Sequence, residues 1–249
     1  MREDVARTLE EVDRGAEAPK GEKYIPNKVS FWRLIAILRE FQKGFNLIQK
    51  YSLAVTFFGS SRECLSKETY AEVTKLARIL SKDGFTVITG GGGGVMGAAN
   101  KGAHEAGGDS VGVNIKLPHE QNLNKYTTDS KEFKYFFIRK IMLSFASEAY
   151  IFFPGGYGTL DEFFEIITLI QTKKIQPIPV VLVGKSYWSP LIEWINKTLY
   201  EKKGTINKED LEIFFLVDNA EEAHKATHLL LKKLCPTCLA DHGVAEKCE

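Results

Sequence analysis

The apolar positions along the chain follow two alternating patterns. Short runs rich in β-branched and aromatic residues are typical of strands buried on both faces of a sheet. Between these runs, apolar residues recur at the spacing of amphipathic helices. The runs predict strands at residues 53–58, 85–89, 111–115, 150–153, 178–183 and 213–217. The helical spacing predicts helices at residues 31–48, 66–83, 133–147, 160–174, 188–200 and 220–234, with another that opens at residue 95.

This alternation indicates the fold class. Strands that alternate with helices build an α/β fold around a parallel sheet, and right-handed crossovers follow for such units. We therefore expect a Rossmann-like open parallel sheet with helices on both faces, in a single domain. Residues 1–28 are polar and lack a sustained period, which predicts a flexible N-terminal arm. Residues 29–234 form the expected domain, including an N-terminal helix, and residues 235–249 form a tail that contains cysteines.

The stretch 150–164 combines a buried strand, a glycine-rich turn and the start of a helix. Pro154 ends the strand, because proline has no N–H to give to the sheet. The three glycines within residues 155–158 allow a sharp turn and a close approach of a ligand to the backbone, and Thr159 is a favourable helix N-cap. A glycine turn that feeds a helix N-terminus offers free N–H groups and a positive dipole end. This stretch therefore predicts an anion site, with phosphate as the usual ligand.

Thr159 and Glu162 also allow a purely structural interpretation of the same stretch. A threonine N-cap followed three residues later by glutamate forms a capping box, which stabilises a helix start and needs no function. A capping box requires neither the preceding glycines nor Pro154. The residues alone leave both interpretations of Glu162 open.

Three expected strands end in turns that suit a nucleotide: Gly59-Ser60-Ser61, the run Gly90–Gly94, and the turn 155–159. In an open parallel sheet, ligands bind outside the carboxyl ends of the strands, and all three turns lie on that edge. The competing interpretation is a dinucleotide fingerprint, which Gly92, Gly94 and Gly97 allow by their spacing. That fingerprint needs an acidic residue about 20 residues further on, and strand 111–115 ends without one.

Composition excludes several classes of protein. The chain has 249 residues, of which 44% are hydrophobic and 26% charged, and this is ordinary for a globular protein. The net charge of +1 gives no electrostatic reason to expect nucleic acid or an anionic membrane as a partner. No apolar run is long enough for a membrane helix, and no apolar signal core follows the charged N-terminus. We expect a cytoplasmic protein.

The cysteines are too few for a disulfide scaffold in a chain of this length. Cys235, Cys238, His242 and Cys248 follow one another in an order that could ligate zinc tetrahedrally. Their spacing does not match a standard zinc finger closely, so the alternative is a reduced tail without metal. We expect no metal at the glycine turns and no organic cofactor.

Two charged residues outside the glycine turns are candidates for a functional role. Arg139 lies in a helical stretch among unusually apolar neighbours, so its face is expected to be partly buried. A guanidinium there could bind a phosphate or a carboxylate with two hydrogen bonds. Glu120 lies in the long polar stretch 116–131, where loops of such folds commonly carry function. Arg139 could equally be an exposed helix charge, and the residues alone favour plain solvation for Glu120.

The string Pro154-Gly-Gly-Tyr-Gly-Thr-Leu-Asp-Glu162 resembles the PGGxGTxxE signature of the LONELY GUY family. That family was long labelled lysine decarboxylase and includes cytokinin-activating phosphoribohydrolases. The resemblance covers about residues 53–217. Arg139-Lys140 matches the Arg-Lys pair of the family at the family's spacing from Glu162, and residues 90–100 resemble its glycine-rich segment, with Met96 at the methionine. One departure is Phe137, which stands where the family's Met-His-x-Arg-Lys pattern has histidine.

The resemblance implies a set of site residues. Arg139 and Glu162 would be the catalytic pair. The implied substrate-binding residues are Gly59, Ser60, Met96, Glu120, Arg139, Lys140, Gly155, Gly156, Tyr157, Gly158, Thr159, Leu160, Asp161, Glu162 and Thr168. The implied substrate is a nucleoside 5′-monophosphate, with AMP and its N6-modified cytokinin forms left open, and the implied reaction is cleavage of its N-glycosidic bond. Lysine decarboxylation fits poorly, because it needs pyridoxal phosphate on a lysine with an acid paired to the ring nitrogen.

Two further expectations follow. A nucleotide-binding or sensor protein without catalysis is the alternative to the enzyme, because the same pocket could hold a nucleotide without cleaving it.

The helix 31–48 has apolar residues beyond one stripe. The helix that carries Phe136, Phe137 and Ile141 is richer in aromatic residues than one covering face requires. Such surface usually marks an interface. We expect a homodimer, as the resemblance also implies, and a hexamer stays open.

Overall fold

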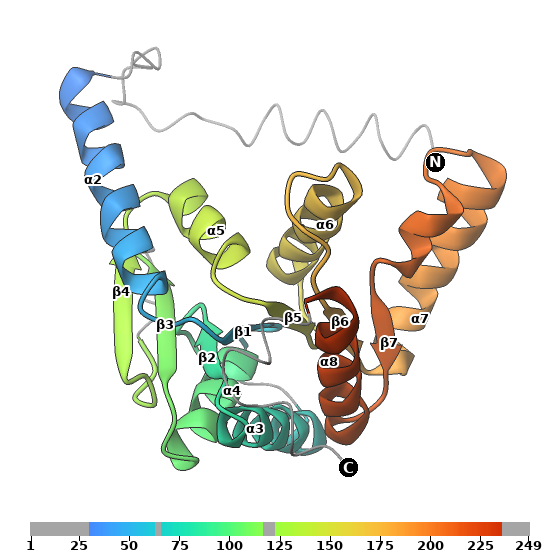
Figure 1. The fold of residues 1–249 in the computed structure, drawn as a ribbon, viewed down its shortest axis with the longest axis horizontal. Coiled ribbons are helices and arrows are strands. Elements are labelled where there is room, and N and C mark those ends of the chain that lie inside the picture. Colours follow the sequence, from blue (N-terminus) through green and yellow to red (C-terminus); the bar gives the residue numbers. More distant parts are fainter. Residues whose placement is uncertain (1–29, 63–65, 117–122, 236–249) are drawn as a thin grey trace, which may run out of the picture. The chain divides into compact units, whose positions relative to one another are not determined.

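Figure 1 shows the fold in a computed structural model, which describes residues 30–62, 66–116 and 123–235. Contacts within the chain divide it into two compact units, Met1–Ala36 and Ile37–Glu249. The described part of the first unit is the beginning of helix α2 (Phe31–Ile48), and the second unit contains the remainder of α2 and the other described elements. The expected arm and most of the expected tail lie outside the described residues. No helix in the described ranges is long and apolar enough to cross a membrane.

Within the described residues, seven strands form one parallel sheet in the order β4-β3-β2-β1-β5-β6-β7. The strands are β1 (Ala54–Phe58), β2 (Thr86–Thr89), β3 (Ser110–Ile115), β4 (Asp129–Phe133), β5 (Ala149–Phe152), β6 (Val180–Val183) and β7 (Phe215–Val217). Every pair of neighbours in this order is parallel. The structure thus confirms the α/β fold with an open parallel sheet.

Helices cover both faces of the sheet (Figure 1). After α2, the helices are α3 (Lys67–Lys82), α4 (Gly94–Glu105), α5 (Phe136–Ser144), α6 (Tyr157–Gln171), α7 (Lys185–Trp194) and α8 (Ala220–Leu234). Val55 and Phe57 face the core formed with α3, α4 and α8. Ala54 and Phe58 face the second core, which contains residues of α5, α6 and α7. Strand side chains alternate between faces, so consecutive residues of β1 serve opposite cores.

The order of the strands fixes where a ligand can bind. From β1 the chain builds β2, β3 and β4 outward on one side, and it then returns to place β5 on the other side of β1. The carboxyl ends of β1 and β5 are paired in register, with Phe58 opposite Phe152. They therefore flank a topological switch point, where open α/β sheets leave a crevice for ligands.

The structure differs from the predicted elements at β4, at the start of α5 and at α7. Residues 129–133 form β4, whereas the sequence predicts an irregular loop there, and Phe133 ends this strand rather than opening the next helix. β4 is an edge strand whose side chains are mostly partly exposed, so it lacks the apolar run that marks a buried strand. The helix expected at 188–200 begins at Lys185 and changes into a π-helix over Ile195–Lys202.

Candidate active site

A cavity of about 370 Å³ opens at the carboxyl edge of the sheet. It is lined by Phe57, Phe58, Gly59, Ser60, Ser61, Arg62, Gly90, Met96, Ile115, Phe136, Arg139, Leu143, Gly156, Tyr157, Gly158, Thr159 and Glu162. The turns after β1, β2 and β5 all contribute to this wall, as the sequence predicts from its three glycine turns. The cavity therefore lies at the topological switch point.

Ser60 joins the turns of the cavity wall to one another. Its backbone N–H donates to the carbonyl of Pro154 at 3.1 Å, and its carbonyl accepts from the N–H of Val95 at 2.9 Å. One residue after β1 is thus bonded to the signature turn after β5 and to the first turn of α4. Since its backbone groups are used in this way, Ser60 serves to hold the three turns in fixed relative positions.

Gly155 is required by the close packing of these turns. A Cβ atom at this position would lie 2.0 Å from the hydroxyl oxygen of Thr159 and 2.9 Å from the backbone nitrogen of Ser60. Thr159 is buried in the helix and Ser60 is held by its backbone bonds. The turn after β5 and the turn after β1 can therefore approach this closely only if the residue lacks a side chain.

We expect Gly155→Ala to destabilise the protein by about 1–3 kcal/mol, the usual cost of overpacking. Gly158→Ala is the matched control, because a Cβ there would meet no atom within 4 Å. Alanine within a helix is about 0.5–1 kcal/mol more favourable than glycine, so the control should be as stable as the parent or slightly more stable. Urea unfolding of both variants measures the difference, and equal midpoints would show that the turns can separate at no cost.

Helix α6 begins at the cavity without a side-chain cap. Its N-cap is Gly156, which offers no side chain, so the prediction that Thr159 caps the helix is wrong. Thr159 lies in the third position of the helix, and its N–H donates to the Gly156 carbonyl at 3.0 Å. No hydrogen bond is made by the backbone N–H groups of Tyr157 and Gly158 to any described residue. These two donors are available to a ligand in the cavity.

Glu162 lies one turn further along α6, and the structure excludes the capping-box interpretation because the N-cap is Gly156 rather than Thr159. The residue is 5% exposed. Its Oε2 is buried and has no hydrogen-bond partner in the described part of the chain. Burial raises the pKa of this carboxyl group from 4.5 to about 7, while the charges of Lys140 and Arg139 oppose the shift and Glu165 adds to it. A carboxyl group in this setting can exchange a proton near neutral pH.

Arg139 reaches the cavity from α5. Its Nε donates to the backbone carbonyl of Val113 at the end of β3, at 3.0 Å. The guanidinium then passes so close to Gly90 that a Cβ there would lie 2.1 Å from its Nη2. The ring of Phe136 lies 6.0 Å from the guanidinium carbon, which is within cation–π range. Burial lowers the pKa of the guanidinium and Glu162 opposes this, yet an arginine stays charged in proteins.

Other residues implied by the resemblance lie outside the cavity lining. Nζ of Lys140 lies 2.5 Å from Oδ2 of Asp161 and 2.9 Å from Oε2 of Glu165, and these two ion pairs link α5 to α6. Leu160 packs against the core beneath the helix, and Thr168 is exposed nearly two turns beyond Glu162. Glu120 lies outside the described residues, as do Cys238, His242 and Cys248 of the tail. The prediction that these residues bind substrate or zinc stays a prediction. Cys235, the first residue of the expected zinc set, is disulfide-bonded in this structure, so its thiolate is not available for zinc unless that bond is reduced.

The cavity also contains residues that the sequence analysis did not select. Arg62 adds a second guanidinium to the wall, from the turn after β1. Phe136 and Leu143 add apolar surface from α5, and Ile115 adds more from the end of β3. The glycine turn before Arg62 gave a signal for that residue. The apolar residues gave none, since their spacing also suits a helix or strand core.

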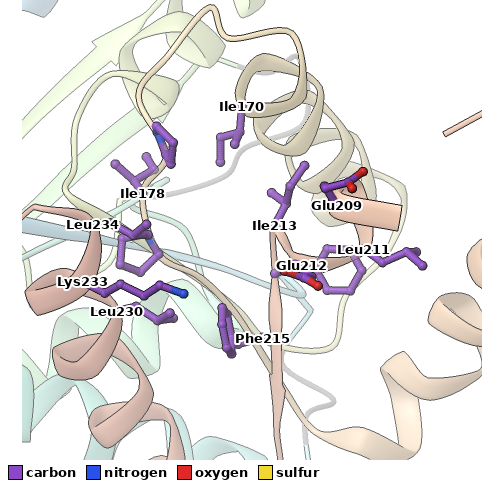
Figure 2. Close-up of a pocket in the computed structure, with 13 residues that line it drawn as sticks. Ile170, Ile178, Glu209, Leu211, Glu212, Ile213, Phe215, Leu230, Lys233 and Leu234 are labelled. Carbon is purple, nitrogen blue, oxygen red and sulfur yellow. The ribbon is translucent and has the colours of Figure 1, made fainter. Parts of the chain in front are cut away.

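A larger cavity of about 570 Å³ lies elsewhere in the fold (Figure 2). Figure 2 shows mostly apolar side chains around it, among them Ile170 of α6, Phe215 of β7 and Leu230 of α8, with Glu209, Glu212 and Lys233 as its charged residues. It adjoins the residues before β6 and the start of β7, so it lies toward the amino edge of the sheet. None of the catalytic candidates lines it. The smaller cavity is therefore the functional candidate on chemical grounds.

The fold and this cavity define a Rossmann-like α/β protein with free N–H groups at a helix N-terminus, a buried carboxyl group and a guanidinium at its switch point. Residues 96–227 match the family model described as "Possible lysine decarboxylase". The chain is 31% identical over 185 residues to the cytokinin riboside 5′-monophosphate phosphoribohydrolase LOG5 of Arabidopsis thaliana, covering 70% of this chain and 75% of that protein. The protein belongs to this family, the LONELY GUY family of N-glycosyl hydrolases.

Further relatives agree with this assignment. A cytokinin riboside 5′-monophosphate phosphoribohydrolase of Mycobacterium tuberculosis is 31% identical over 172 residues, covering 66% of this chain and 89% of that protein. The X-ray structure of the structural genomics target TM1055 has a TM-score of 0.55 and 26% identity, covering 71% of this chain and 99% of that chain. The Moco carrier protein of Chlamydomonas reinhardtii shares the fold, with a TM-score of 0.56, 21% identity, and coverage of 73% and 99%.

Proposed function

We propose that this protein hydrolyses the N-glycosidic bond of a purine nucleoside 5′-monophosphate, either AMP or an N6-modified AMP, to a free base and ribose 5-phosphate. The observation that carries the proposal is the buried carboxyl group of Glu162, whose Oε2 has no partner in the described residues and which does not cap the helix. An unpaired buried carboxyl group costs stability. Its position in the cavity beside free helix N–H groups suits catalysis on an anionic substrate.

The 5′-phosphate is assigned to the start of α6. The free N–H groups of Tyr157 and Gly158 and the positive end of the helix dipole favour a phosphate there. Gly156 and Gly158 support this placement, because a Cβ at either position would meet only open space. Neither glycine has a positive φ. The protein's own packing therefore does not demand a glycine at either position, whereas a ligand close to the backbone does.

The reaction requires an electron-poor sugar carbon to be stabilised. Cleavage of a glycosidic bond passes through a transition state with oxocarbenium character, and an ionised Glu162 can stabilise that cation or activate the attacking water. The oxygen of water bonds to the anomeric carbon, and the C–N bond breaks with its electron pair going to the base. The proton that water loses balances the proton that the leaving base gains. Arg139 binds the phosphate or stabilises the leaving base, and the two roles stay open.

A nucleotide-binding protein without catalysis is the competing function. The electrostatics of the cavity favour the enzyme, because a carboxyl group beside a bound anion weakens ground-state binding by like-charge repulsion. In catalysis the same charge is useful, since it is directed at a cation that exists only in the transition state. An assay for free base after incubation with AMP and with N6-modified AMP decides between the two functions, and tight binding of these nucleotides without release of a base would establish the binding protein.

We expect kcat/KM for AMP to exceed that for adenosine by about tenfold or more, which is the value of a phosphate at a helix N-terminus. A panel of nucleoside monophosphates and their nucleosides, assayed for free base, measures this ratio and identifies the base. Gly158→Ala should raise KM for AMP while leaving the fold intact, because its methyl group would enter the open space at the helix start. Equal turnover of AMP and adenosine would show that the phosphate is not bound at the start of α6.

We also propose that the protein acts as a homodimer through α5. Phe137 is 47% exposed on this helix, and Phe145 just beyond it and Leu38 of α2 are exposed as well. The ring centroids of Phe137 and Phe41 are 6.3 Å apart, so the exposed aromatic surface continues onto α2. Phe136, in the same helix, lines the cavity and contacts Arg139. Pairing through this surface would therefore bear directly on the site.

Phe137→Glu should shift the protein from dimer to monomer in light scattering at dilute concentration, because a charge at the centre of an apolar interface is costly. Phe215→Glu is a matched control, since Phe215 is also partly exposed but lies on β7. We expect the control to keep its mass. A parent protein that scatters as a single chain and still cleaves its substrate at full rate would contradict both the dimer and its link to catalysis.

A further inference from the structure

Asp83, His224 and His228 form a cluster on the face of the sheet covered by α3, α4 and α8. Asp83 is the residue at which α3 ends, and it lies just before the amino end of β2. His224 and His228 are one turn apart on α8, so their side chains share one face of that helix. The candidate active site lies at the carboxyl edge of the same sheet. The cluster is therefore separate from it and plays no part in the proposed reaction.

The three side chains converge on one point. Oδ2 of Asp83 lies 2.6 Å from Nε2 of His224 and 2.9 Å from Nε2 of His228. All three ligand atoms lie within 4.8 Å of one another. The two imidazole rings meet edge to face with centroids 4.6 Å apart, and the ring of Phe85 packs against that of His228 with centroids 5.7 Å apart. The side chain of His228 is only 6% exposed, whereas those of Asp83 and His224 are 21% exposed.

We propose that Asp83, His224 and His228 bind a divalent first-row transition metal ion, with Zn²⁺ as the expected ion. Two imidazole nitrogens and one carboxylate oxygen form a donor set that zinc commonly takes in proteins, and the remaining position of a tetrahedron is open to water. Imidazole ligands also favour zinc, copper, iron and nickel over magnesium and calcium. Two histidines spaced by one helical turn present their nitrogens to the same ion, as they do in helical zinc sites.

Metal binding requires a small adjustment of the cluster. Ligand bonds of ~2.0–2.2 Å at tetrahedral angles place the ligand atoms ~3.3–3.6 Å apart, and the present nitrogen–oxygen distances are 2.6 Å for His224 and 2.9 Å for His228. The Asp83 carboxylate must therefore separate from His224 by roughly 0.7–1.0 Å and from His228 by roughly 0.4–0.7 Å. Asp83 and His224 are partly exposed, so they can move without disturbing the core. His228, which is buried against Phe85, acts as the fixed ligand.

The consequence of binding is a link between parts of the chain that are distant in sequence. The metal ion would join α8, the last described helix, to the turn between α3 and β2. An ion that binds the folded chain and not the unfolded chain raises stability by mass action. The site would therefore act as a structural clamp on the helix before the tail.

The test uses the full chain, stripped of metal, and titrates it with ZnCl₂ by calorimetry and by thermal unfolding. His224→Gln is the informative variant, because the glutamine amide can still donate to Asp83 but is a poor zinc ligand. We expect one zinc ion at this site in the parent, a rise in Tm on adding zinc, and at least tenfold weaker binding with no rise in Tm for His224→Gln. A parent whose Tm does not respond to zinc, or a variant that binds and responds like the parent, would overturn the proposal.

Cysteines of the tail are a second place where zinc could bind, so a double variant, Cys238→Ser with Cys248→Ser, serves as the control. We expect this control to keep the zinc affinity of the parent. Co²⁺ in place of Zn²⁺ gives an independent answer, because nitrogen and oxygen ligands produce only visible d–d bands. A strong ultraviolet thiolate-to-cobalt band in the parent, lost in the double cysteine variant, would place the ion on the tail and overturn the proposal.

Discussion

Replacement of Glu162 by glutamine should lower kcat by about 10²–10⁴-fold, which is the usual contribution of a positioned acid or base. The amide keeps the size and polarity of the side chain but can neither ionise nor accept a proton at neutral pH. Since α6 begins at Gly156 rather than at a capping box, the change does not touch the helix start. The measurement is release of free base at saturating substrate. A variant that retains near-parental kcat would show that Glu162 has no catalytic role.

The same substitution should stabilise the folded protein at alkaline pH. Burial raises the pKa of the Glu162 carboxyl group to about 7 in the folded state, compared with 4.5 when it is unfolded. The folded state therefore holds a proton that the unfolded state releases between these two values, so the stability contribution of Glu162 falls as pH rises through that window and is lowest above pH 7. The cost is about 3 kcal/mol. Glu162→Gln should recover part of it at pH 8 and little at pH 4.

Glu165→Gln is the matched control for both effects. Glu165 lies on the same helix and is paired with Lys140 at 2.9 Å, yet it does not line the cavity. We expect its replacement to change kcat by less than about tenfold and to give less stabilisation at pH 8 than Glu162→Gln, because the ion pair with Lys140 is lost while the Glu165 charge that raises the pKa of Glu162 is removed. An equal loss of activity in the two variants would show that α6 needs negative charge in general rather than Glu162 in particular.

The sequence predicts most of the fold because buried strands and amphipathic helices leave strong patterns. Helix α8 begins and ends where predicted, at Ala220 and Leu234, since Asn219 caps its start and its apolar positions keep one face. β4 was missed because it is an edge strand, which pairs with β3 alone in the sheet and carries mostly polar side chains. Local apolar pattern reports burial, and β4 has little of it.

The site could be predicted only in part, for a related reason. The glycine turns identify the edge of the sheet on which the site lies, because glycine is needed where backbones or ligands approach closely. Thr159 misled the prediction of the helix start, since its side chain suits an N-cap while the glycine at 156 leaves the N–H groups free for a ligand. The raised pKa of Glu162 depends on burial by segments distant in sequence, and no local pattern encodes that.

Substitution of Arg139 by alanine should lower kcat/KM by about 10²–10³-fold, which is typical for the loss of one preorganised electrostatic contact in an active site. Arg139→Lys should recover only part of the activity. Lysine restores the charge, but it cannot reproduce the hydrogen bond from Nε to the Val113 carbonyl that fixes the direction of the guanidinium. Parental activity in either variant would contradict a role for Arg139 in the reaction.

Lys140 provides the sharpest comparison with Arg139, because the family resemblance assigns it to the substrate while the structure pairs it with Asp161 and Glu165. Burial is the largest influence on the pKa of Glu162. The charge of Lys140 is the second largest, and it lowers that pKa. Lys140→Gln should therefore raise that pKa further. If ionised Glu162 is the active form, the rise of kcat/KM with pH should move to higher pH in this variant. Most of the activity should then be recovered at pH values above the shifted pKa of Glu162. A loss that no pH restores would instead place Lys140 on the substrate, as the resemblance implies.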